Sequence, residues 1–113
     1  MNAEPEFRAR VVAEQEATRR LLEELRHDLR GVIAASAGNN ADDEHDPEGA
    51  TIAFERAQLS ALIDQAAARL RELDRAHERL DAGSYSRCEQ CGGAIGDQRL
   101  LARPATRRCL GCA

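Results

Sequence analysis

The residues of this chain best suited to chemistry are its four cysteines, which form two pairs separated by seventeen residues: Cys88-x-x-Cys91 and Cys109-x-x-Cys112. This spacing is typical of a structural Zn²⁺ site, in which two turns each supply two thiolates to a tetrahedral ion at about 2.3 Å. Because all four positions are cysteine, no coordination position remains for water, so we expect a structural rather than a catalytic site. Gly92-Gly93 follows the first pair and permits the tight backbone of such a turn.

Other roles for the cysteines remain open from their spacing alone: two disulfide bonds, a redox-active pair or an iron–sulfur cluster. The N-terminal stretch MNAEPEFRARVV lacks the basic start and apolar core of a secretory signal, and no βαβ pattern surrounds either pair. No apolar run approaches the roughly 20 residues that span a bilayer. We therefore expect a cytoplasmic protein with no membrane segment, in which thiols stay reduced.

The charge of the chain argues against a nucleic-acid binder. Its formal net charge is -4, and it contains no lysine, so every strong cation is an arginine. From residue 84 onward, five arginines and two acidic residues give a net charge of +3. Four thiolates around Zn²⁺ contribute roughly -2, which leaves about +1 and a weak attraction for phosphate. We expect no direct sequence-specific binding to nucleic acid.

Two long amphipathic helices must position the cysteines. In residues 4–36 and about 47–82, apolar side chains recur at spacings close to three and four, as on one face of a helix. Asp46-Pro47 is a start signal for the second helix, and Gly83 is a stop signal. The first stripe contains Val11, Leu22, Leu25, Leu29, Val32 and Ser36, and the second contains Ile52, Leu59, Leu62 or Ile63, Ala66, Leu70, Leu73, His77 and Leu80.

Neither stripe is wide enough to stabilise its helix alone, so each must be buried against another helix. The stripes have similar lengths and a short connection, which favours an antiparallel hairpin with coiled-coil packing in a monomer. An intermolecular coiled coil is the alternative. The predicted fold is therefore mostly α: a long antiparallel coiled-coil hairpin over residues 1–83, with an acidic tip loop at 38–49, followed by a small C-terminal four-cysteine zinc finger over 84–113.

The tip loop concentrates negative charge. Acidic residues are favoured at helix N-termini, which explains Asp46 as a cap and Glu48 as a first-turn residue. The remaining acids repel one another and suggest a probe that meets a cationic or metal-containing pocket on a partner. The candidate tip residues are Asp42, Asp43, Glu44, Asp46 and Glu48.

The residues around the cysteines resemble the zinc finger of the DksA/TraR family. The resemblance implies one structural zinc ion held by Cys88, Cys91, Cys109 and Cys112. It also implies a non-enzymatic transcription regulator that inserts its coiled coil into the secondary channel of bacterial RNA polymerase, with the tip near the active centre and no sequence-specific DNA contact. It rests on Gly83, Tyr85, Cys88, Cys91-Gly92, Ile95, Arg99-Leu100, Ala102, Pro104, Cys109 and Cys112.

Some positions depart from the family pattern. The family's tip has the form D-x-x-D-x-A, whereas Asp46-Pro47-Glu48-Gly49-Ala50 is one residue shorter, so Glu48 or the acids at 42–44 would take the place of the second aspartate. The family's cooperation with guanosine tetraphosphate uses basic side chains that include lysine, which this chain lacks. Two other functions remain alternatives: a zinc-finger coiled-coil adaptor that mediates protein–protein interaction, and a small DNA-binding zinc protein.

Overall fold

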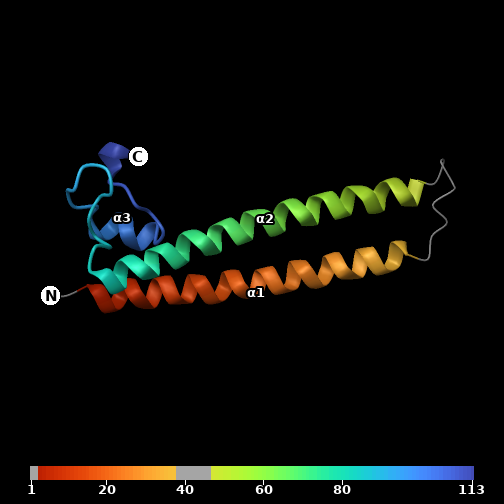
Figure 1. Cartoon of the computed structure of the whole chain (residues 1–113), viewed down its shortest axis with the longest axis horizontal. Coiled ribbons are helices and arrows are strands. Elements are labelled where there is room, and N and C mark those ends of the chain that lie inside the picture. The colour runs from red at the N-terminus through yellow and green to blue at the C-terminus, as the bar shows by residue number, and fades with distance from the viewer. Residues whose placement is uncertain (1–2, 38–46) are drawn as a thin grey trace. The chain divides into compact units, whose positions relative to one another are not determined.

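The computed structural model describes residues 3–37 and 47–113, although not the side chains of Pro47 and Glu48. Two long helices, α1 (Glu4–Ser36) and α2 (Pro47–Ala82), form a helical hairpin (Figure 1). A short helix, α3 (Asp97–Ala102), and a 3-10 turn, η1 (Leu110–Cys112), follow in the cysteine-rich segment. The predicted mostly helical fold is confirmed, and the only strand-like pairing in the described part of the chain is an isolated bridge between Arg87 and Ala94.

The helix ends agree with the sequence prediction where the structure describes them. Gly83 has a φ angle of 78°, a left-handed conformation that glycine adopts at little cost. The N–H of Gly83 donates to the carbonyl of Leu80 at 3.2 Å, and the N–H of Ser84 donates to that of Arg79 at 2.9 Å. These two hydrogen bonds form a Schellman motif, which satisfies the last carbonyls of α2 and turns the chain toward the cysteines.

The predicted tip loop falls largely outside the described residues. This applies to Asp42, Asp43, Glu44 and Asp46, to the cap assigned to Asp46, and to the side chain of Glu48. The role of these carboxylates therefore stays a prediction.

The chain divides into two compact units, and the first consists of residues 19–68. Within it, the predicted stripe of α1 is buried or half-buried, and α2 presents its own stripe to this seam. Ile63 rather than Leu62 continues the stripe of α2, since Leu62 is 40% exposed. The covered side chains are Leu22, Leu25, Leu29, Val32 and Ser36 of α1, with Ile52, Leu59, Ile63 and Ala66 of α2.

The second unit combines residues 1–18 with residues 69–113, so that both helix ends share one core with the cysteine-rich segment. The rings of Phe7 and Tyr85 lie with centroids 5.5 Å apart and planes tilted by 52°, a favourable aromatic geometry. The predicted division at residue 83 between hairpin and zinc finger stays a prediction. The core consists of Phe7, Val11, Ala76, Leu80, Tyr85, Cys88, Ile95 and Leu100.

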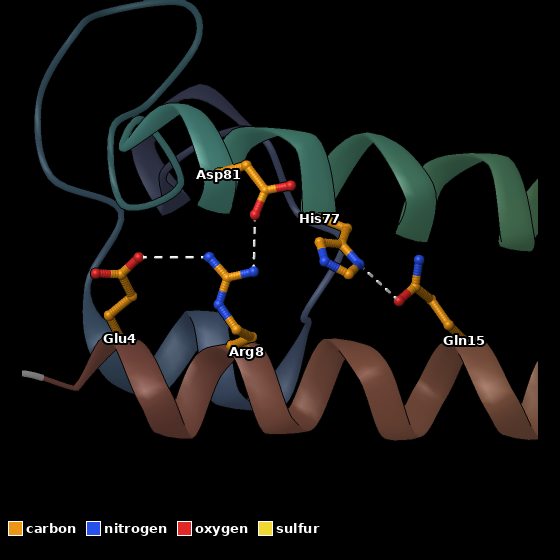
Figure 2. Close-up of polar contacts among 5 residues, drawn as sticks. All are labelled: Glu4, Arg8, Gln15, His77 and Asp81. Atoms are coloured by element: carbon orange, nitrogen blue, oxygen red, sulfur yellow. Dashed lines mark hydrogen bonds and ion pairs between the residues drawn. The ribbon is translucent and has the colours of Figure 1, made fainter.

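A polar layer crosses the seam in this second unit. Gln15 is only 4% exposed, and its amide nitrogen donates to Asp74 Oδ1 at 2.8 Å. Nδ1 of His77 lies 3.0 Å from the amide oxygen of Gln15, so this nitrogen must carry the donated proton (Figure 2). Both ends of a buried amide are thereby satisfied, which removes the penalty for burying it.

One heptad away, Arg8 links the helices a second time. Its guanidinium donates to Asp81 Oδ1 at 2.8 Å and lies 3.6 Å from Glu4 in the same helix (Figure 2). The hydrogen bond from Arg8 lowers the pKa of Asp81, so this pair stabilises the fold at neutral pH and is lost on acidification. From Arg8 to Gln15 the chain advances seven residues, and from Asp81 to Asp74 it returns seven, as antiparallel coiled-coil packing requires.

The glycine at position 31 lies inside α1, where nothing about the backbone calls for glycine. A Cβ built on Gly31 would meet no atom within 4 Å, and the residue has no left-handed φ angle. Glycine inside a helix costs about 1 kcal/mol relative to alanine. Gly31 therefore lowers the stability of α1, and neither the backbone conformation nor the packing around this position requires glycine.

We predict that Gln15→Ala destabilises the protein by about 2 kcal/mol, because Asp74 and His77 each lose a hydrogen bond in a part-buried seam. The free energy of unfolding, measured by urea denaturation of the zinc-loaded protein, tests this expectation. Gln58→Ala, at an exposed position of α2, is the matched control and should have almost no effect. Equal stabilities of the two variants would show that the polar layer does not stabilise the seam.

Candidate metal centre

The structure brings together the four cysteines that the sequence predicts as metal ligands. Their sulfur atoms all lie within 4.8 Å of one another, and those of Cys91 and Cys109 are 3.8 Å apart. A tetrahedron of thiolates at about 2.3 Å from Zn²⁺ places its sulfurs about 3.8 Å apart, so the arrangement fits this ion. Cys88 is buried, Cys91 is exposed, and Cys109 and Cys112 are half-buried.

The first pair lies on a tight backbone turn. The N–H of Cys88 donates to the carbonyl of Gly93 at 2.7 Å, and the N–H of Gly92 donates back to Cys88 at 3.0 Å. Gly92 has a φ angle of 76°, which confirms that glycine is needed here. The N–H of Gly93 also points at the sulfur of Cys91, at 3.4 Å, where it stabilises negative charge on a thiolate.

The second pair flanks the 3-10 turn η1: Cys109 precedes it as the N-cap, Cys112 is its last residue, and the N–H of Cys112 donates to the carbonyl of Cys109 at 3.0 Å. A backbone hydrogen bond of 2.8 Å from Glu89 to the carbonyl of Arg107 ties this segment to the first turn. The guanidinium of Arg107 lies 3.6 Å from the carboxylate of Glu89. Two pairs that are far apart in sequence are thus held face to face by main-chain contacts.

Arginine and tyrosine side chains hold the segment between the pairs. Arg99 of α3 donates through Nε to the carbonyl of Arg108 at 2.9 Å, directly before Cys109. Arg79 of α2 donates to the carbonyl of Thr106 at 3.2 Å, and burial lowers its pKa. The hydroxyl of Tyr85 donates to the carbonyl of Pro104 at 2.7 Å.

These contacts give roles that sequence reasoning did not assign. In the sequence, Tyr85, Arg99 and Pro104 stand out only as parts of a family pattern. Nothing in the sequence predicts that Arg79 contacts the carbonyl of Thr106. The contact from Arg79 depends on tertiary packing, because 27 residues separate it from Thr106.

The electrostatics of the cluster favour a bound cation. Hydrogen bonds from the backbone of Cys91 and Cys109 lower the pKa of the Cys88 thiol to about 6. Hydrogen bonds with the sulfurs of Cys109 and Cys91 raise the pKa of the Cys112 thiol to about 12. Four thiolates so close together would repel one another, so the four thiols do not all lose their protons without a cation. A divalent metal ion supplies the positive charge that lets all four act as thiolates.

Within residues 3–37 and 47–113, no helix combines the length and the hydrophobicity required to traverse a lipid bilayer.

We predict that Cys88→Ser lowers the zinc content from about one ion per chain to nearly none and lowers the melting temperature. The reason is that the metal is linked to folding of the core that contains Cys88. Zinc content by mass spectrometry and thermal unfolding provide the measurements. Ala94→Ser places a serine at a neighbouring exposed position and should retain the ion. Unchanged stoichiometry in Cys88→Ser would refute the ligand assignment.

Comparison with known proteins supports the same kind of site. Residues 83–113 match the model of the prokaryotic DksA/TraR C4-type zinc finger. An uncharacterized protein of Aquifex aeolicus (strain VF5) is 46% identical over 55 residues, which amount to 49% of this chain and 38% of that protein. In fold, the chain is similar to transcription factor DksA2 from Pseudomonas aeruginosa, with a TM-score of 0.82 and 24% identity over 96% of this chain and 78% of that one.

The family match and the cysteine geometry together support one structural Zn²⁺ ion, as the sequence predicted. The resemblance described from the sequence is confirmed, with the family pattern lying in the cysteine-rich segment and the fold similarity extending over the long helices. Residues 83–113 of this chain therefore form a zinc finger of the prokaryotic DksA/TraR family, on a chain with the fold of DksA2.

Proposed function

We propose that this protein is a transcription factor that acts by binding bacterial RNA polymerase directly. The observation that carries the proposal is the similarity in fold to transcription factor DksA2 over 96% of the chain, combined with a family zinc finger at residues 83–113. The protein regulates without sequence-specific DNA contact and without catalysis of its own. It acts as a cytoplasmic monomer.

In the proposed mode of action, the helical hairpin enters the secondary channel of the polymerase and carries the acidic loop 38–49 toward the active centre. Asp42, Asp43, Glu44, Asp46 and Glu48 supply the negative charge. A channel lined by cationic groups and ending at catalytic Mg²⁺ attracts a carboxylate-rich loop and orients it during association. The loop then changes the lifetime of the open complex at promoters.

The zinc finger serves as a rigid base for the two helix ends. Cys88 and Tyr85 share a buried core with Phe7 of α1 and Leu80 of α2, which supports this role. A four-cysteine site leaves no coordination position for a substrate or a water molecule, so the metal contributes folding energy and no chemistry.

The test is capture of purified bacterial core RNA polymerase by the zinc-loaded protein. Specific binding is the expected result, and a variant without a metal centre, such as Cys88→Ser, should lose it together with its stability. Absence of binding by the folded, zinc-loaded protein would overturn the proposal. The adaptor function would then be favoured, because Leu110 in η1 is 79% exposed on the zinc finger and offers an apolar contact to another protein.

We predict that replacing Asp43, Glu44 and Asp46 together with alanine removes the effect on transcription and leaves polymerase binding intact. The fold should lose only about 1 kcal/mol, for the helix cap at Asp46. Open-complex lifetime in a purified transcription assay and polymerase capture are the two measurements.

The matched control removes three acidic residues at exposed positions of the helices, Glu16, Glu23 and Asp64. It has the same net charge as the tip variant and should still regulate. A tip variant that changes open-complex lifetime as much as the natural chain would show that the loop is not the working end.

A further inference from the structure

The unit of residues 19–68 contains a shallow groove of about 380 Å³ between α1 and α2. Its apolar lining comes from Val32 and Ala35 of α1 and Ile52 of α2, and His27 of α1 also lines it. Asp28 of α1 and Glu55 of α2 bring one carboxylate from each helix to the same groove. In the described part of the chain, neither carboxylate has an ion-pair partner.

Gly31 keeps this groove open. It lines the groove, and a Cβ built there would meet nothing within 4 Å beyond the neighbouring backbone of its own helix. A methyl group at position 31 would therefore meet no steric conflict, and alanine would favour the helix more than glycine does. The absence of a side chain at position 31 has no benefit for the fold, but it leaves room for an atom group that comes from outside.

We propose that the groove receives an arginine or lysine side chain of RNA polymerase; this inference rests on the proposed function. The chemistry of the lining selects such a side chain, because its methylene stem can lie on Val32, Ala35 and Ile52 while its charged head reaches Asp28 and Glu55. Two carboxylates beside an apolar surface complement a cation on an aliphatic stem better than a neutral apolar side chain. A metal ion is a poorer fit, since only the four cysteines gather as a metal-binding group among the described residues.

The location of the groove agrees with a protein partner that surrounds the hairpin. It lies on both long helices and belongs to the unit of residues 19–68, which contains none of the cysteines. A contact there would hold the helices along the channel, whereas the acidic loop acts at the active centre. The two features have separate effects: the groove contributes affinity, and the loop contributes the change in transcription.

The experiment measures the affinity of zinc-loaded, full-length variants for core RNA polymerase at low and at moderate salt. Gly31→Leu should fill the groove and weaken binding about tenfold. Asp28→Asn combined with Glu55→Gln should weaken binding by a similar factor and reduce its salt dependence. Gly31→Ala should bind nearly as well as the natural chain and should raise the melting temperature by about 4 °C, because only the helix propensity changes.

Matched controls separate the groove from the rest of the unit. Ala61→Leu adds the same side chain at an exposed position of α2 outside the groove, and Glu23→Gln with Asp64→Asn removes two exposed carboxylates elsewhere. Both controls should keep the natural affinity.

The failure of this inference differs from the failure of the proposed function. If the natural chain binds polymerase and the groove variants bind equally well, the groove is not a docking site, and the proposed function stands. If the natural chain does not bind, both proposals are overturned. A dimeric natural chain that Gly31→Leu converts to a monomer would show that the occupant is a second copy of the protein, which also contradicts the proposal.

Discussion

The buried core around Cys88 joins the ends of the two long helices to the cysteine-rich segment, and the packing of this unit depends on it. The chain has few aromatic residues, and its two long helices carry narrow apolar stripes that cannot stabilise them separately. In the unit that contains the metal centre, Cys88 lies 2% exposed among side chains from both helix ends and from α3. A metal that orders the cysteines therefore also orders the residues on which α1 and α2 meet.

Once the helix ends are fixed, the polar layer selects how they face each other. Apolar stripes alone tolerate a shift of one helix along the other, because one leucine replaces another with little loss. A buried amide tolerates no such shift, since Gln15 is satisfied only where Asp74 and His77 lie opposite it. The ion pair between Arg8 and Asp81 repeats the same pairing one heptad away, and the two contacts together specify a single register.

The proposed activity uses this rigidity. A loop of like charges has an unfavourable energy of its own and gains a benefit only when it meets positive charge on a partner. Helices held in one register would deliver that loop to a defined place, and the groove around Gly31 would supply affinity at a separate point along the hairpin.

Much of this protein can be predicted from its sequence because the relevant signals are local. The spacing of the cysteine pairs predicted the metal centre, and the periodic stripes together with Pro47 and Gly83 predicted helices that the structure places at Glu4–Ser36 and Pro47–Ala82. Only the tertiary structure determined the features that depend on contacts between residues far apart in the sequence. It assigned Gln15 to the buried seam although the residue is polar, it chose Ile63 over Leu62, and it brought Arg79 to Thr106. Such outcomes depend on which side chains lie opposite each other across the fold, and periodicity along one segment carries no information about its partner.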